Sequence, residues 1–236
     1  MVILYLTHVC PTNRVYASVS TYTYDNFNRL KTADPYGAST TTNKYDAFGQ
    51  RTQKTTNGTT TTYYYDGQNV ILEKESSGSE ARNIYGINLI ASQDSEGTLY
   101  YLYNGHADVV QVTDASGTLV NEYDYDIFGN ILTQTEQRDN PYKYAGYYHD
   151  SETGYYYLNA RYYDPATSRM LTEDSYWGDI RDPLSLNLYT YCKNNPILYV
   201  DPSGHIGVKA DGSIYMADGD TELDKQLLQL KIDYSK

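Results

Sequence analysis

The pattern of apolar and polar residues along most of the chain is that of short β-strands separated by tight turns. Runs rich in Thr, Val, Ile and Tyr alternate with turns built from Gly together with Asp, Asn or Ser. Asn57-Gly58 lies between TQKTT and TTTTYYY, which is the strongest short signal for a hairpin. Residues 118–125 alternate with a period of roughly two, so we expect one buried and one wetted face there.

A repeat organises these strands from Tyr22 onward. Its core is Tyr-Asp or a close variant, often followed by Phe-Gly or Gly, and the intervals between successive repeat tyrosines are 21, 20, 20, 18, 22 and 19 residues. A period near 20 is too short for a helical hairpin and fits two short strands and two turns per unit. We therefore predict an all-β fold of stacked antiparallel strands. The repeat tyrosines are Tyr24, Tyr45, Tyr65, Tyr85, Tyr103, Tyr125 and Tyr144.

Both ends of the chain differ from the repeats. Residues 1–19 do not match the repeat pattern and form an irregular N-terminal segment. Near the other end, Thr221-Glu222-Leu223-Asp224 resembles a capping box, and Leu223, Leu227 and Leu230 come after it at helical spacing. We predict a short terminal amphipathic helix, whose apolar face needs a cover because an isolated helix of this length is marginal.

Composition narrows the classes of function. The net charge of −12 argues against a nucleic-acid-binding face and against electrostatic binding to an anionic membrane. The 30 tyrosines, set against 3 Phe and 1 Trp, suit half-buried β-layers, since each ring packs while its hydroxyl reaches a polar group. The four histidines and the two cysteines, Cys10 and Cys192, are dispersed, so we expect no metal, no cofactor and two unrelated thiols rather than a disulfide.

The stretch from Arg161 to Gly204 carries more detail than a repetitive β-chain needs, and it reveals a family. Residues 22–205 resemble bacterial Rhs (YD-repeat) proteins through the Tyr-Asp repeats, YDYDIFGN, YAGYYHDSETGYYYLNARYYDPATSRMLTEDSY and NLYTYCKNNPILYVDPSG. The resemblance implies a spiralling β-shell that encloses a C-terminal toxin and a core domain that plugs the shell. It divides the chain into residues 1–19, YD repeats at 20–141, the core domain at 142–205 and a variable tail at 206–236.

The same resemblance implies partners and a location. The shell would hold its own C-terminal toxin or pair with further N-terminal repeats, and an immunity protein or a target-cell glycan would be additional partners. The protein would be secreted or displayed at the cell surface. We expect this chain to be a fragment, because the 31 residues after His205 are too few to bury an enzyme core.

In some branches of the family the core domain is an aspartyl autoprotease that frees the toxin. That motif falls on Arg161, Asp174 and Asp201, with the cut expected after His205, where toxin members usually have a bulky aliphatic residue. Two carboxylates held close together do not both ionise readily, so one keeps a proton at neutral pH. The ionised one can take a proton from water, while the protonated one polarises the carbonyl. Arg161 would orient one carboxylate through a bidentate pair.

A purely structural interpretation competes with catalysis. Asp201-Pro202-Ser203-Gly204 fits a type I turn, and Asp34-Pro35-Tyr36-Gly37 has the same pattern inside a plain repeat, where no chemistry is expected. Two other functions remain open: an adhesion or glycan-binding module, and an inactive remnant. The tyrosine runs at 63–65 and 155–157 could stack sugars, but packing within a β-wall is the favoured role.

Overall fold

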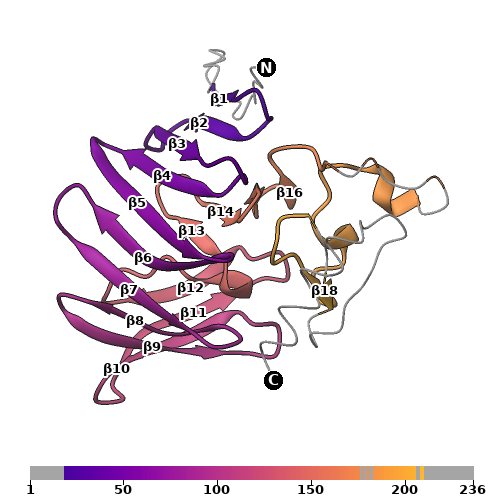
Figure 1. Cartoon of the computed structure of the whole chain (residues 1–236). Helices are drawn as coiled ribbons and strands as arrows, with labels where there is room; N and C mark the ends of the chain where they lie inside the picture. The colour runs from indigo at the N-terminus through magenta and orange to yellow at the C-terminus, as the bar shows by residue number, and fades with distance from the viewer. Residues whose placement is uncertain (1–18, 176, 178–179, 181–182, 206–207, 210–236) are drawn as a thin grey trace, which may run out of the picture.

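The computed structural model describes residues 19–175, 177, 180, 183–205 and 208–209. The predicted all-β antiparallel fold is confirmed: a 12-stranded sheet runs in chain order from β1 to β12 (Figure 1). The predicted terminal helix lies outside the described residues. The strands of this large sheet are β1 (Thr21–Tyr24), β2 (Leu30–Asp34), β3 (Thr41–Tyr45), β4 (Arg51–Thr56), β5 (Thr59–Asp66), β6 (Asn69–Glu75), β7 (Glu80–Tyr85), β8 (Leu89–Asp94), β9 (Gly97–Tyr103), β10 (Val109–Asp114), β11 (Leu119–Tyr125) and β12 (Ile131–Glu136).

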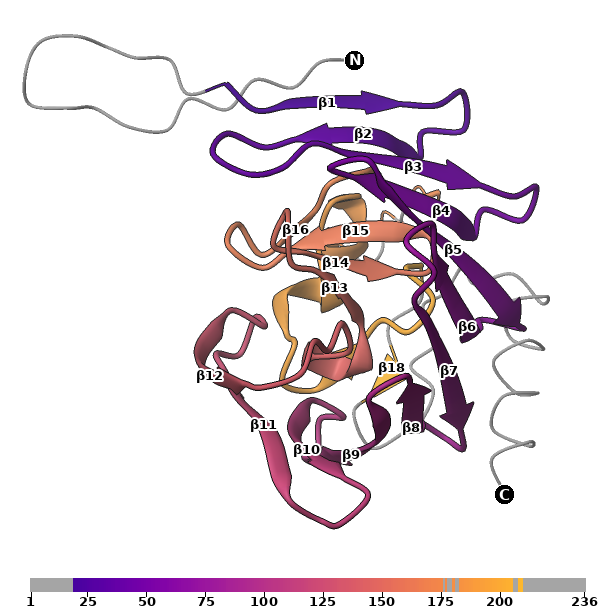
Figure 2. The ribbon, with the colours of Figure 1, turned by 90° about the vertical axis from the view of Figure 1, so that its left-hand side faces the viewer.

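A smaller, four-stranded sheet lies in the stretch that the sequence predicts to be the core domain, and that name is kept for residues 142–205 below. The large sheet curves around it, so the smaller sheet lies within the concave side (Figure 2). It contains β13 (Tyr148–Asp150), β14 (Tyr155–Leu158), β15 (Arg161–Asp164) and β16 (Arg169–Met170). The remaining elements are the 3-10 turns η1 (Tyr144–Gly146), η2 (Pro183–Leu186) and η3 (Cys192–Asn194), and the short pair β17 (Tyr199–Val200) and β18 (Val208–Lys209).

In three of the repeats the Asp closes a turn between two strands. The Asp25 carboxylate accepts hydrogen bonds from the backbone N–H groups of Phe27 at 2.9 Å and Arg29 at 3.0 Å. Asp46 and Asp126 do the same in their repeats. Asn104 replaces Asp in one repeat and accepts equivalent bonds through its side-chain oxygen. An Asx turn of this kind needs a short side-chain acceptor, which explains the repeated residue.

In four of the repeats the Tyr ties neighbouring strands together. The hydroxyl of Tyr45 donates to the carbonyl of Leu30 at 2.6 Å, and Tyr65 donates to Arg51 at 2.8 Å. Tyr103 and Tyr125 bond the first residues of β8 and β10 in the same way. In the tyrosine runs at 63–65 and 155–157, Tyr63 and residues 155–157 are buried, Tyr65 is half-buried and Tyr64 is exposed, so most of these rings pack within the fold.

The structure confirms one local prediction and refines two others. The Asn57-Gly58 hairpin is confirmed, with positive φ at both residues. The alternation at 118–125 is interrupted, because the register shifts where β10 meets β11 and leaves Val120 and Asn121 both buried. The turn at Asp34 begins one residue later than a type I turn would, since Ala38 N donates to the carbonyl of Pro35.

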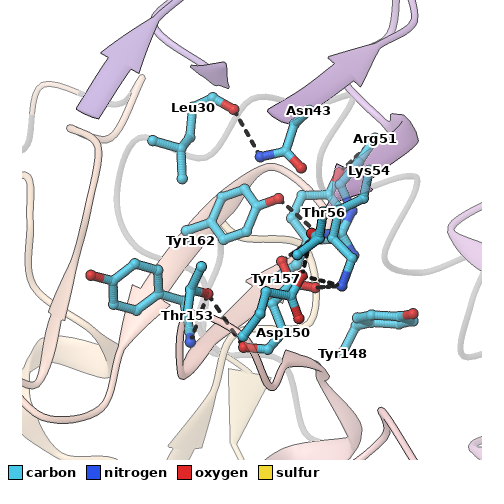
Figure 3. Close-up of polar contacts among 12 residues, drawn as sticks. Leu30, Asn43, Arg51, Lys54, Thr56, Tyr148, Asp150, Thr153, Tyr157 and Tyr162 are labelled. Carbon is cyan, nitrogen blue, oxygen red and sulfur yellow. Dashed lines mark hydrogen bonds and ion pairs between the residues drawn. The ribbon is translucent and has the colours of Figure 1, made fainter. Parts of the chain in front are cut away.

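The two sheets are joined by a buried ionic cluster (Figure 3). Arg51 of β4 reaches Asp150 of β13 at 2.6 Å, and Lys54 bonds the other oxygen of Asp150 at 2.9 Å. Arg51 also donates to the hydroxyl of Tyr162 at 2.8 Å. The core domain is therefore fixed to the wall by charge as well as by packing.

A second junction covers one repeat turn. Three tyrosines of the core domain donate to consecutive carbonyls of the β11–β12 turn, at Ile127, Phe128 and Gly129, over 2.8 to 2.9 Å. The donors are Tyr144, Tyr163 and Tyr156. The tyrosines thus hold this turn against the part of the chain that carries the candidate site.

Candidate active site

The structure brings together all three candidate residues although they are far apart in the sequence. Arg161 opens β15, Asp174 follows β16 and Asp201 follows β17. The side chains of Arg161 and Asp201 are each 5% exposed, and that of Asp174 is 16% exposed. The site is therefore closed on the Arg161–Asp201 side and more open to solvent at Asp174.

The guanidinium of Arg161 links the two carboxylates. Its Nη2 lies 2.7 Å from Asp174 Oδ2 and 3.3 Å from Asp201 Oδ2. The same group donates through Nε to the carbonyl of Gly204 and through Nη1 to that of Leu188 at 3.3 Å. The sequence suggested a bidentate pair with one carboxylate; the structure instead shows one nitrogen that contacts both.

The environment distinguishes the two aspartates. Burial raises the pKa of Asp201, the charge of Asp174 adds to this rise, and the charges of Arg161 and His205 oppose it. Asp174 is more exposed and has the shorter contact with the guanidinium, which favours its ionised form. This arrangement suits Asp201 to hold a proton and Asp174 to accept one.

Backbone contacts position both aspartates. The N–H of Asp201 donates to the hydroxyl of Tyr147 at 2.6 Å, and that hydroxyl lies 3.1 Å from the hydroxyl of Tyr191. The N–H of Asp174 donates to the carbonyl of Leu188 at 2.9 Å. Sequence reasoning did not single out Tyr147, because within YAGYY it is indistinguishable from the tyrosines that pack the wall.

Gly204 lets the Asp201 segment approach β15. Its φ is +77°, and a Cβ there would lie 2.4 Å from the carbonyl oxygen of Leu158 and 3.0 Å from the backbone nitrogen of Arg161. Both obstacles are backbone atoms, so they cannot move aside cheaply. A glycine is therefore required here for the segment to reach Arg161.

We expect Gly204→Ala to displace the Asp201 segment and to lower the free energy of unfolding by about 2–4 kcal/mol, from overlap and backbone strain. Gly154→Ala is the matched control, because Gly154 has a φ of +76° but nothing within 4 Å of its added Cβ. The control should lose only about 1–2 kcal/mol, from backbone strain alone. Urea denaturation followed by circular dichroism measures both, and equal losses would contradict a close approach at Gly204.

His205 stands at the open side of the site. Its side chain is 42% exposed, and its Nδ1 lies 3.5 Å from Asp174 Oδ1 and 3.5 Å from the hydroxyl oxygen of Ser175. The preceding residue, Gly204, is held by Arg161. Because Arg161 also contacts Asp174 and Asp201, this bond keeps His205 close to both carboxylates.

Among the described residues, no group of three or more His, Cys, Asp or Glu residues is arranged to hold a metal ion. Cys192 is a buried free thiol. In the part of the chain that the structure describes, no helix has the length and apolar character needed to cross a membrane.

The fold and its enclosed core define a tyrosine-rich β-repeat shell. The family model for the teneurin YD-shell matches residues 18–197. The chain therefore belongs to the teneurin YD-shell family, and the resemblance to YD-repeat proteins inferred from the motifs is confirmed.

Individual proteins of known name or structure are also similar to this chain. A tRNA3(Ser)-specific nuclease WapA from Bacillus spizizenii is 40% identical over 204 residues, which cover 82% of this chain and 9% of the relative. The tRNA nuclease WapA of Bacillus subtilis strain 168 is also 40% identical over the same shares. The crystal structure of TcdB2-TccC3 matches 81% of this chain and 11% of that chain, with a TM-score of 0.65 at 20% identity, and so supports the fold. The chain spans about 9% of the length of the WapA relatives.

Proposed function

We propose that this chain is part of a shell that encloses and presents a C-terminal toxin, and that its core domain cuts the chain after His205. The observation that carries the proposal is the contact of one guanidinium nitrogen of Arg161 with both Asp174 and Asp201. The names of the WapA relatives, which are tRNA nucleases, support a toxin as the cargo. A toxin of this kind would act outside the producing cell, so we propose that the protein is secreted or displayed at the surface.

The proposed reaction is a single hydrolysis of the peptide bond that comes after His205. Asp174 takes a proton from water while the water oxygen attacks the carbonyl carbon of His205. Asp201 donates its proton to a hydrogen bond with the carbonyl oxygen, where negative charge develops. The C–N bond then breaks, Asp174 passes the proton that it took from water to the leaving nitrogen, which becomes an amine, and His205 ends in a carboxyl group.

Arg161 has two roles in this scheme. It holds the carbonyl of Gly204, which fixes the residue immediately before the one that is cut. It also keeps Asp174 and Asp201 on one nitrogen, so that neither carboxylate can turn away. Holding the reacting groups in place in this way lowers the entropic part of the barrier to hydrolysis.

Intact mass spectrometry of the purified chain tests the proposal. We expect the wild type to yield a product that ends at His205, and Asp174→Asn and Asp201→Asn to slow the cut by about a hundredfold or more. Asp34→Asn is the matched control, because Asp34 lies in the same Asp-Pro-x-Gly pattern but is exposed, and its side chain accepts hydrogen bonds from the hydroxyls of Thr21 and Thr40. It should cut at the wild-type rate.

The outcome against self-cleavage is equally clear. A wild-type chain that keeps its full mass for days, at neutral and at mildly acidic pH, has no working site. Circular dichroism of each variant verifies that loss of cutting does not reflect loss of fold. A folded but uncut chain would leave the shell as a scaffold or an adhesion module.

A further inference from the structure

The repeat turn between β9 and β10 carries a histidine where three other repeat turns carry a phenylalanine. The residues in question stand two positions after the Asp or Asn that closes each turn, and they are Phe27, Phe48, His106 and Phe128. Phe27 and Phe48 are exposed, whereas the side chain of His106 is only 16% exposed. The rest of the fold therefore covers the one ring that can carry a charge.

Acceptor groups lie on both sides of the His106 ring. Its Nδ1 lies 2.8 Å from Asp108 Oδ1. Its Nε2 is buried and makes no hydrogen bond of good geometry with the described residues, although the carbonyls of Pro196 and Tyr199 lie beside the ring. A neutral imidazole can donate from only one of its nitrogens, so only the protonated ring is attracted by the carboxylate on one side and by the carbonyls on the other.

The carboxylate that holds His106 is also bound by the core domain. Asp108 Oδ1 accepts a hydrogen bond from the backbone N–H of Ala145 in η1 at 2.8 Å. Tyr147 comes directly after η1, and its hydroxyl accepts the N–H of Asp201. The turn with His106 is thus docked on the same part of the core domain that positions Asp201.

We propose that His106 is a positioning residue that, as an imidazolium, ties the β9–β10 turn to residues 196–199 and so holds Asp201 in the candidate site. This inference rests on the proposed function of that site. Tyr199 comes only two residues before Asp201, so movement of this segment would move the aspartate. Self-cleavage would then require that this turn of the wall is docked on the core domain.

The tie should weaken as pH rises. Burial disfavours the charged ring of His106, but the Asp108 carboxylate and the two carbonyls outweigh it and raise its pKa above the ordinary 6.5. A raised folded-state pKa gives stability that is fully present below pH 6.5 and is lost as pH rises through the folded value.

The other titratable groups that face His106 among the described residues keep their charge states over this range. Burial opposes the charge of Asp108, but its bonds to His106 and Asn104 hold its pKa below the usual value, so it stays ionised. The ring centre of Tyr144 lies 5.2 Å from that of His106, and burial raises the pKa of this phenol, so it stays neutral. His106 is consequently the group that would change the tie.

Hydrogen exchange of backbone amides tests the tie without any cutting. The chain carries Asp174→Asn so that it stays whole, and it is compared with and without His106→Phe, which introduces the residue of the other turns. The hydrogen-bonded amides of Leu198, Tyr199 and Asp201 should exchange about tenfold faster in the Phe variant at pH 6, and less than about twofold faster at pH 8.5. An equal ratio at both pH values overturns the role of the charged ring.

Rates of cutting, followed by intact mass in chains that keep Asp174, connect the tie to the site. At pH 6, His106→Phe should be cut about tenfold more slowly than the wild type, and at pH 8.5 less than about twofold more slowly. His149→Gln is the matched control, because burial lowers the pKa of His149 to about 4 and leaves that ring neutral at both pH values. Its rate relative to the wild type should be the same in both buffers.

The two readouts separate the ways in which the proposal can fail. An exchange effect combined with wild-type cutting overturns the positioning role of His106 while self-cleavage stands. A wild type that is never cut overturns self-cleavage and the positioning role together.

Discussion

Arg51→Met is expected to lower the free energy of unfolding by about 3–5 kcal/mol, which is the usual result of removing one partner of a buried ion pair. The side chains of Arg51 and Asp150 are each 1% exposed, and their nitrogen and oxygen lie 2.6 Å apart. Without the guanidinium, Asp150 keeps Lys54, whose side chain is 12% exposed, and stays buried with its charge only partly offset.

Ring contacts add to this loss. The guanidinium carbon of Arg51 lies 4.5 Å from the ring centre of Tyr157, 4.8 Å from that of Tyr63 and 4.9 Å from that of Tyr148. A desolvated cation over aromatic faces is a favourable contact that methionine reproduces only in part. Tyr63 belongs to the large sheet and the other two to the small one, so the same side chain stabilises the junction of the two sheets.

The effect of Arg51→Met should also depend on pH. Burial would raise the pKa of Asp150, but the charges of Arg51 and Lys54 outweigh it and hold the pKa below the ordinary 3.8. A carboxyl group with a depressed folded-state pKa adds stability above its unfolded pKa and loses it as pH falls through the folded value. The wild type should therefore lose this contribution below about pH 4, and the variant should lose less.

Urea denaturation, followed by circular dichroism at pH 7 and at pH 3, measures both statements. Arg29→Met is the matched control: Arg29 pairs with Asp25 at 2.6 Å and lies over the rings of Phe27 and Tyr45, but the paired side chains are 19% and 23% exposed. An ion pair with that exposure should contribute about 1 kcal/mol or less. Similar losses for the two variants would show that burial does not set the strength of the Arg51 cluster.

Local sequence was sufficient to predict most of the large sheet, because its rules are local. The turn at Asn57-Gly58 and the Asx turns depend on residues within four positions of each other. The repeat spacing of Tyr45 and Tyr65 fixes which strand each hydroxyl meets. The exception is the β10–β11 register shift, where strand pairing overrides the alternation around Val120.

The junction of the sheets was not predictable in this way. Arg51 and Asp150 are 99 positions apart, and neither stands in a pattern that marks an ion pair. The candidate site is intermediate. Arg161, Asp174 and Asp201 were identified by resemblance alone, while Tyr147 and the close approach at Gly204 depend on how β15 packs against the Asp201 segment. A contact across packed layers leaves no trace in the spacing of residues along one strand.

Gly129→Ala is expected to destabilise the protein by about 3 kcal/mol or more, because two separate penalties combine at this position. The φ of Gly129 is +86°, which costs any residue with a Cβ about 1–2 kcal/mol. The added Cβ would also lie 2.6 Å from Cδ1 and 2.7 Å from Cγ of the buried Tyr144 ring. That ring is held by the bond of its hydroxyl to the carbonyl of Ile127, so it has little freedom to retreat.

Gly49→Ala isolates the clash from the backbone strain. Gly49 occupies the corresponding position in the turn of another repeat, with a φ of +92°, but nothing lies within 4 Å of its added Cβ. The control should lose about 1–2 kcal/mol, so the difference between the variants measures the contact between the repeat turn and the core domain. Urea denaturation of both variants gives that difference, and equal losses would show that Tyr144 yields freely. A clear excess for Gly129→Ala would mean that the turn and the core domain unfold as one unit, since a clash with Tyr144 destabilises the wall only if the core stays docked on it.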